Sequence, residues 1–223
     1  MKIFFYCTVF ICFMAHAQHI EKPKRTPFGL VVNMRGASEF NQEAIFNRDT
    51  LHQDGIIHTL EGARLKIYFY YAHLMAIMDN GSKIEVKLEN GVLHIKQLQG
   101  FVRWYVGSRP KTDEINFELQ TPNTSITSLG GDFLLSYLPE LKETEALVFG
   151  KKISFIKLKE HADYTDLGPF EWAGLGGRFT DHIGEKFKFP VKLVKKQEHY
   201  YSMHSKLVFG KRDRELFNQI VPF

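Results

Sequence analysis

Apolar and polar residues alternate along much of the chain from residue 28 to residue 158. Apolar side chains occupy every second position within 65–69 and again within 84–88. A period of two is typical of β-strands that bury one face and expose the other. The same criterion predicts further short strands at 102–106, 115–119, 133–137 and 153–158. Since no helix of three turns is predicted before residue 158, we predict an all-β domain over residues 28–158.

Tight turns separate these strands. Asn80-Gly81 and Asn90-Gly91 lie ten residues apart, and Gly100 follows at a similar interval. Asn-Gly pairs readily adopt the positive φ angles that hairpin turns require. Short strands at this spacing indicate a sandwich, a barrel or a coiling β-roll.

The pattern changes after residue 158. A glycine-rich loop is predicted at 174–177, a strand at 187–194, and a short amphipathic helix at 212–220. We predict that residues 159–223 form a short mixed extension, which packs on the β domain and is not a domain of its own.

The N-terminus has the features of a cleavable signal peptide. Lys2 precedes an apolar run at 3–14, and the small residues of Ala15-His16-Ala17 suit a signal peptidase. Twelve helical residues rise only about 18 Å, against about 30 Å of hydrocarbon, so a retained anchor is the weaker interpretation. We predict a signal peptide at 1–17, a flexible linker at 18–27 with two prolines, and export to the periplasm.

Removal of residues 1–17 leaves 223 − 17 = 206 residues, enough for one domain with an appendage. The formal charge of +4 falls to +3 when Lys2 is lost, and an excess this small does not indicate nucleic-acid binding. Both cysteines, Cys7 and Cys12, lie in the signal peptide. The mature chain therefore has no disulfide, thiolate zinc site or cysteine nucleophile. No later segment is apolar enough to span a membrane.

Several short motifs follow one another in order along the predicted strands. They are Leu51, Gly55, Ile57 and Thr59; Leu65-Lys66-Ile67; Asp79-Asn80-Gly81-Ser82; the glycine-led aromatic strand at 100–106; Thr121-Pro122; and Leu129-Gly130-Gly131-Asp132-Phe133. Taken in this order, the motifs resemble the FecR domain family. Two positions depart from the family pattern: Asp54 precedes Gly55 instead of following it, and Gly131 replaces a threonine.

The resemblance implies an all-β, coil-like or solenoid-like roll that acts as a sensory or binding module in the periplasm. In the last motif it implies a sharp turn before a strand, so we expect Gly130, Gly131 and Phe133 to be structural. Family members that regulate sigma factors carry a cytoplasmic segment and a transmembrane helix ahead of this domain. Because this chain begins with a signal peptide instead, we expect a free-standing periplasmic binding role.

Candidate catalytic and metal-binding patterns are weak. Residues 108–111 and 154–157 fit the Ser-x-x-Lys pattern of penicillin-recognising enzymes, which places both side chains on a helix. The first segment contains a proline and the second alternates like a strand. His199 and His204 have a spacing that suits neither a helical nor a strand metal pair, and 174–177 lacks the flanking strand and helix of a phosphate loop. We expect no catalytic residue, metal or cofactor.

Exposed aromatic residues are the remaining candidates for a binding surface. The charges that alternate along 83–89 predict a solvated strand face. Aromatic rings on such a face can anchor a protein or stack on sugars. The candidates that we single out are Tyr68, Tyr70, Trp104 and Trp172.

We therefore predict a non-catalytic module that binds an envelope protein, for which a free strand edge would offer β-augmentation. The alternative is a protein that binds envelope glycan, peptidoglycan or polysaccharide, through these aromatics. A cell-wall hydrolase is the third possibility.

Overall fold

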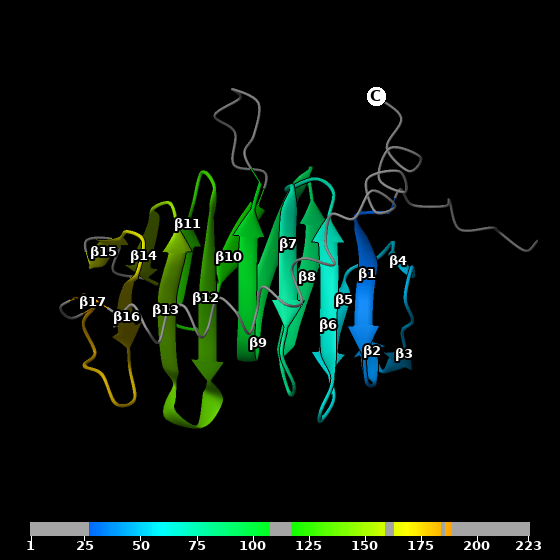
Figure 1. Ribbon diagram of the computed structural model, residues 1–223, viewed down its shortest axis with the longest axis horizontal. Coiled ribbons are helices and arrows are strands. Elements are labelled where there is room, and N and C mark those ends of the chain that lie inside the picture. The colour runs from blue at the N-terminus through cyan, green and yellow to red at the C-terminus, as the bar shows by residue number, and fades with distance from the viewer. Residues whose placement is uncertain (1–26, 108–116, 159–162, 184–185, 189–223) are drawn as a thin grey trace, which may run out of the picture.

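The computed structural model describes residues 27–107, 117–158, 163–183 and 186–188. Within them the chain forms seventeen strands and one 3-10 helix, η1 (Pro139–Leu141). The prediction of an all-β fold is therefore confirmed. The strands build two stacked layers, which we name sheet A and sheet B (Figure 1).

Sheet A has nine strands, counting one that it shares with sheet B. Their spatial order is β4 (Thr50–Leu51), β1 (Gly29–Arg35), β6 (Arg64–Phe69), β7 (Leu74–Met78), β9 (Val92–Val106), β12 (Gly131–Leu138), β13 (Glu143–Gly150), β16 (Glu171–Leu175) and β17 (Phe187–Lys188).

Sheet B also has nine strands, again counting the shared one. Their order is β3 (Glu43–Ala44), β2 (Ser38–Phe40), β5 (Gly55–Thr59), β8 (Lys83–Glu89), β9, β10 (Phe117–Gln120), β11 (Thr124–Thr127), β14 (Ile153–Lys157) and β15 (Tyr164–Leu167). Since the chain passes repeatedly from one sheet to the other, the fold is a coiling roll, which is one of the three arrangements that the turn spacing indicated and the one that the family resemblance implied.

Strand β9 joins the two sheets. Its first half pairs with β8 in sheet B, and its second half pairs with β7 and β12 in sheet A. The strand bends at Gly100, whose φ is +83°. The sequence pattern predicted a turn here between separate strands, and this prediction is wrong, because backbone pairing continues on both sides of the glycine.

The core fills the space between the sheets, and its largest member is Trp104, which is fully buried. The indole Nε1 donates to Gln97 Oε1 at 3.2 Å. The amide nitrogen of Gln97 in turn donates to the carbonyl oxygens of Gly100 and Leu135, at 2.8 and 2.9 Å. A buried polar group is costly unless it has partners. Gln97 therefore satisfies the backbone where β9 crosses between sheets.

The predicted extension begins with strands that belong to the roll. Strand β15 extends sheet B, and strands β16 and β17 extend sheet A. Gly174 and Leu175 lie in β16 and not in a loop, because they pair with Glu145 and Thr144 of β13. The ring of Phe179 would lie 2.4 Å from a Cβ at Gly174, so only glycine fits there. The predicted strand at 187–194 is observed as β17, and its later part and the predicted helix at 212–220 lie outside the described residues.

Candidate functional site

The motifs that carry the family resemblance form internal hydrogen-bond networks. Thr59 Oγ1 donates to the Asp79 carbonyl at 2.5 Å and accepts from the Ser82 N–H at 2.9 Å. Ser82 Oγ then bonds both backbone groups of Phe101, at 2.9 and 3.1 Å. These residues join turns of sheet B to β9, so they hold the fold and leave no group for a ligand.

A second network of the same kind involves Thr121. Its hydroxyl lies 2.7 Å from Thr124 Oγ1 and 2.9 Å from Thr144 Oγ1, and it also bonds Asn123 Oδ1 at 2.9 Å. All three threonine side chains are fully buried. The Thr59 and Thr121 networks therefore have a structural role in the fold.

The outer face of sheet A, which points away from sheet B, carries a continuous row of directly opposed residues. We name this set the central row. From β1 to β17 its members are Asn33, Lys66, Ile77, Arg103, Leu134, Leu147, Trp172 and Phe187. The row crosses eight strands and is largely apolar, with one lysine and one arginine.

Most side chains along this face are buried. Ile77 and Leu147 of the central row are 7% and 6% exposed, and their neighbours Met75 and Phe149 are 3% and 5% exposed. Among the residues that the structure describes, no helix or strand lies over this face. These side chains are therefore shielded from solvent and are not themselves exposed anchors.

Arg103 is the central charge of the row. Its Nε and Nη2 atoms donate to the two carboxylate oxygens of Asp132, at 2.7 and 2.5 Å. Its guanidinium also lies 4.7 Å from the ring centre of Phe149. A bidentate ion pair and a cation–π contact together fix the guanidinium plane. Arg103 is thus held rigidly at the middle of the sheet.

Two aromatic side chains flank Arg103 on the same strand and remain exposed. Phe101 and Tyr105 are 41% and 45% exposed, and both point to the outer face because residues two apart share a face. Aromatic residues and arginine are the types that contribute most to protein interfaces. We name Phe101, Arg103 and Tyr105 the β9 triplet.

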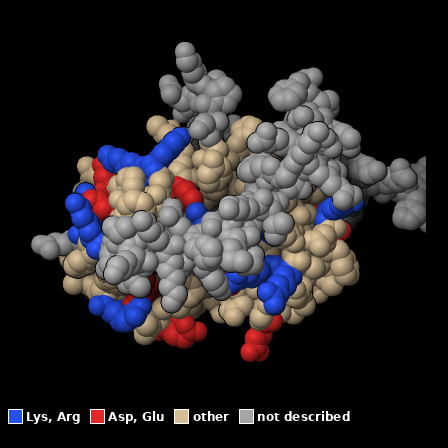
Figure 2. Space-filling model, in the orientation of Figure 1, with Lys and Arg blue, Asp and Glu red and all other residues tan. Residues whose placement is uncertain are grey.

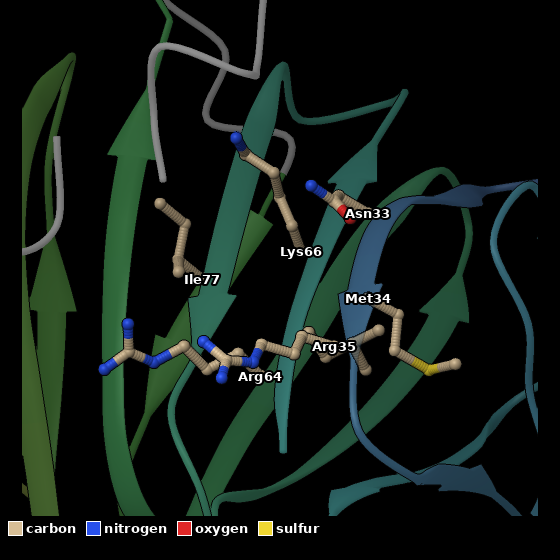
Figure 3. A pocket seen from close by; sticks show the side chains of 7 residues that line it. Asn33, Met34, Arg35, Arg64, Lys66 and Ile77 are labelled. Carbon is tan, nitrogen blue, oxygen red and sulfur yellow. The ribbon is translucent and has the colours of Figure 1, made fainter. Parts of the chain in front are cut away.

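A pocket of about 240 Å³ lies at the β1 end of the face. It forms where a bulge between Val31 and Asn33 shifts the register of β1 against β6. Three cationic side chains and several apolar ones line it (Figure 3), namely Asn33, Met34, Arg35, Arg64, Leu65, Lys66 and Ile77. Arg64 Nε donates to Asp79 Oδ1 at 2.9 Å. Basic residues form separate patches among uncharged ones over this view of the molecule (Figure 2).

An ion pair between a buried glutamate and an exposed arginine fixes a loop to β13 of sheet A. Glu143 is fully buried and accepts from the Arg178 side chain at 2.6 Å and from its backbone N–H at 2.7 Å. These bonds lower the pKa of Glu143 to about 2. Burial raises the pKa of the neighbouring Glu145, which also bonds Arg178 at 2.6 Å. The loop that carries Arg178 is thereby fixed to β13.

Of the four residues of the predicted aromatic surface, one is buried in the core, and a binding role of the other three stays a prediction. Trp104 cannot contribute to it, since its ring lies in the core, 0% exposed. Tyr68 and Tyr70 form an edge-to-face pair with ring centres 5.7 Å apart, and burial raises the pKa of Tyr68 to about 12. Trp172 packs between Phe179 and Phe187, at 5.3 and 5.4 Å. The structure does not bring these four residues together into one patch.

Sequence reasoning missed Phe101 and Tyr105 as surface residues. The alternation around Trp104 indicated two faces in this strand, but it could not say which face is buried. The sequence Arg103-Trp104-Tyr105 did contain a signal. Arginine is rarely buried, so Arg103 and Tyr105 should share the outer face and Trp104 should point inward.

The predicted structural motif forms the turn into β12. Gly130 has φ +151°, and both its N–H and its carbonyl bond the Ser128 hydroxyl, at 3.2 and 3.0 Å. Gly131 begins β12, and Phe133 is fully buried. That these three residues are needed for stability remains a prediction.

The weak catalytic candidates are separated in space or lie outside the described residues. Ser154 and Lys157 lie on β14 and, being three residues apart on a strand, point to opposite faces. Ser154 Oγ bonds Asp166 Oδ1 at 2.6 Å. Residues 108–111, His199 and His204 are not among the described residues. In the described part of the chain, no three His, Cys, Asp or Glu side chains cluster as metal ligands would.

The sheet edges are poorly suited to β-augmentation. Three of the four edge strands, β3, β4 and β17, have only two residues. At the fourth edge, β15, Lys186 Nζ donates to the Asp166 carbonyl at 3.3 Å. Short and covered edges discourage strand addition, so the mechanism that we expected from the sequence has little support.

Comparisons with known proteins identify the fold. No family model matches the sequence. No curated protein matches it either. Two crystal structures of a putative anti-sigma factor from Parabacteroides distasonis are similar, each with a TM-score of 0.51, at 15% and 14% identity. Each similarity covers 63% of this chain and 62% of that chain, so this protein spans less than two thirds of its neighbour. None of the described helices is long and apolar enough to cross a membrane.

Proposed function

We propose that this protein is a non-catalytic sensory or binding module of the periplasm, which engages an envelope protein through the outer face of sheet A. Two independent facts support it. The ordered motifs resemble the FecR domain family, some of whose members regulate sigma factors. The fold resembles that of the putative anti-sigma factor from Parabacteroides distasonis. Both point to regulation by protein contact.

The observation that carries the proposal is the β9 triplet. Its two exposed rings, Phe101 and Tyr105, flank Arg103, which is only 7% exposed and is fixed by Asp132, so the rings are the groups that a partner would contact. Exposed aromatic side chains are typical protein anchors. The pocket lined by Arg35 and Arg64 lies on the same sheet face and would accept an acidic or apolar partner side chain.

Capture of partners from the cross-linked envelope tests this assignment. We expect Tyr105→Ala to reduce recovery of the specific partner at least tenfold, because interface aromatics contribute about 2 kcal/mol or more. Tyr164→Ala is the matched control, since Tyr164 is an aromatic residue of sheet B that is 59% exposed. Equal recovery with both variants would contradict the assignment, and retention by purified peptidoglycan would favour the glycan alternative.

Export is tested separately by the mass of the mature protein. We expect periplasmic extracts to contain a chain that begins at Gln18, because Ala15 and Ala17 suit signal peptidase. Mass spectrometry of the intact protein gives the answer directly. Retention of residues 1–17 in most molecules would refute a periplasmic role of this kind.

A further inference from the structure

The pocket at the β1 end of sheet A brings together side chains that carry hydrogen-bond donors. Asn33 and Arg35 lie two residues apart on β1, and Arg64 and Lys66 lie two residues apart on β6. The strand register places Asn33 opposite Lys66 and Arg35 opposite Arg64. Since residues two apart share one face of a strand, these four side chains mark the corners of a small rectangle. An anion between them would receive hydrogen bonds from both strands.

Arg35 and Arg64 form an unfavourable electrostatic pair. Like charges directly opposite each other on neighbouring strands destabilise a sheet. Arg64 Nε donates to Asp79 Oδ1 at 2.9 Å, whereas Arg35 is exposed and has no carboxylate partner among the described residues. Both arginine side chains nevertheless extend in the same direction across the sheet (Figure 3). Departures from local rules are expected at functional sites, and a bound anion would remove the repulsion.

The charge and the size of the pocket indicate the kind of anion. Its three cationic side chains, taken together with the Asp79 carboxylate, carry a net charge of 3 − 1 = +2. One carboxylate would balance half of this charge, whereas a phosphate monoester carries about −1.5 to −2 near pH 7. Arginine also suits phosphate, because its planar donors match pairs of phosphate oxygens. At about 240 Å³ the pocket is smaller than the roughly 300–1,000 Å³ of sites that enclose a drug-sized ligand, so it takes one group.

We infer that this pocket is a binding site for a dianionic phosphate group, either as the free ion or at the end of a phosphate monoester. Arg35 and Arg64 donate to its oxygens from one side of the rectangle. Lys66 and the amide of Asn33 donate from the other side. Apolar side chains complete the wall, so a short carbon chain on the ester can lie against them. The inference goes beyond the proposed protein partner and does not depend on it, because one chain supplies the whole site.

Methionine methyl groups report binding at this pocket directly. From residue 18 onward the methionines are Met34, Met75, Met78 and Met203. Met34 lines the pocket, whereas Met78 lies in the core, 0% exposed. In NMR spectra of the chain with isotope-labelled methionine methyl groups, inorganic phosphate should shift the Met34 signal saturably and leave the Met78 signal in place.

Sodium acetate at the same ionic strength is the comparison anion and should shift the Met34 signal much less. Absence of a saturable Met34 shift with phosphate would overturn the inference. An equal effect of acetate would also overturn it, because the pocket would then accept any small anion, including a carboxylate of the protein partner.

Two arginine variants test which charge binds the phosphate. Arg35→Gln should weaken phosphate binding at least about tenfold, the usual effect of losing a hydrogen bond to a charged group. Arg48→Gln is the matched control, because Arg48 is also exposed but does not line the pocket. Equal phosphate affinities of the wild type and Arg35→Gln would contradict the inference.

Two further probes distinguish the sources of the phosphate group. Tighter binding of glycerol phosphate than of inorganic phosphate would identify a soluble ester as the ligand. Sedimentation with vesicles of phosphatidylcholine that contain phosphatidic acid, if Arg35→Gln abolishes it, would identify a lipid head group. If neither probe improves on inorganic phosphate, the free ion is the ligand.

Stability measurements distinguish a ligand site from a structural role of Arg35. In chloride, Arg35→Gln should be at least as stable to chemical denaturation as the wild type, because the like-charge pair with Arg64 is gone. In phosphate of equal ionic strength, the wild type should gain more stability than Arg35→Gln, because a ligand that binds only the folded state stabilises it. Arg48→Gln should gain as much as the wild type. Equal destabilisation by Arg35→Gln in both salts would overturn the inference, because the arginine would then support the fold itself.

Discussion

At the scale of single residues, the two faces of β9 have different environments. One face packs in the core, and the other forms part of the outer surface of sheet A. Trp104 belongs to the core, and its neighbours Arg103 and Tyr105 belong to the outer face. One step along a strand reverses the direction of a side chain. Trp104, which we singled out from the sequence as a binding residue, therefore stabilises the fold. Tyr105 beside it is exposed and could contact the proposed partner.

Phe133 and Glu85 should differ sharply in their effect on stability. Phe133→Ala removes a fully buried ring and should lower the free energy of unfolding by about 3 to 5 kcal/mol. Glu85→Lys alters the solvated face of β8, where Glu85 pairs with the exposed Lys87 at 3.0 Å, and should cost about 0.5 kcal/mol. Chemical denaturation of both variants checks this. Similar losses in the two would mean that the buried and solvated faces are reversed.

The buried Glu143 predicts a dependence of stability on pH. Its pKa of about 2 lies below the ordinary 4.5, so its ion pair with Arg178 stabilises the fold fully above about pH 5. That contribution is lost as the pH falls from about 4.5 to 2. Arg178→Ala leaves the buried Glu143 carboxylate without its cation and should lower the free energy of unfolding at pH 7, although solvent screens the exposed Arg178 side chain.

The cost of Arg178→Ala should shrink when denaturation is measured toward pH 2, because Glu143 becomes neutral in both proteins. Lys152→Ala is the control, since its pair with Asp166 is largely exposed and should contribute under about 1 kcal/mol at any pH. A cost of Arg178→Ala that stays constant from pH 7 to pH 2 would show that the loop is held by packing instead.

At the scale of elements, the bend of β9 at Gly100 links the two layers. The residue has φ +83°, and a Cβ there would lie 2.6 Å from the Cα of Ser82. Gly91, in the turn before β9, has nearly the same φ, +80°, but open space around it. Substitutions at these two glycines therefore distinguish the cost of backbone strain, which both share, from the cost of a steric clash, which arises only at Gly100.

Gly91→Ala should cost about 1 to 2 kcal/mol, the price of a left-handed conformation for an alanine. Gly100→Ala should cost clearly more, because the Ser82 backbone must also move. Thermal melts of the two variants, with circular dichroism to verify the fold, make the comparison. Equal destabilisation would show that the approach of β9 to Ser82 carries no cost.

At the scale of the whole molecule, the roll has unequal faces. The outer face of sheet B carries solvated charges such as Glu85 and Lys96, whereas the outer face of sheet A has the central row, the β9 triplet and the pocket. Short or covered edges disfavour strand addition. The proposed partner would therefore bind on the outer face of sheet A.

The sequence by itself determined the all-β class and the solvated face of 83–89. Local periodicity and Asn-Gly turns fix these features, because they depend on near neighbours in the chain. The networks of Thr59 and Thr121 were visible only as motifs, since their partners lie about 20 or more residues away.

Only the tertiary structure decided which face of each strand meets the core, and hence that Tyr105 and not Trp104 is exposed. It also aligned eight strands so that Ile77, Arg103 and Leu147 form one row. Register between strands far apart in sequence depends on the summed packing of both sheets, because a shift of one residue exchanges the faces of a strand. Alternation of apolar and polar residues shows that a strand has two different faces. Packing against the opposing sheet decides which of these faces is buried.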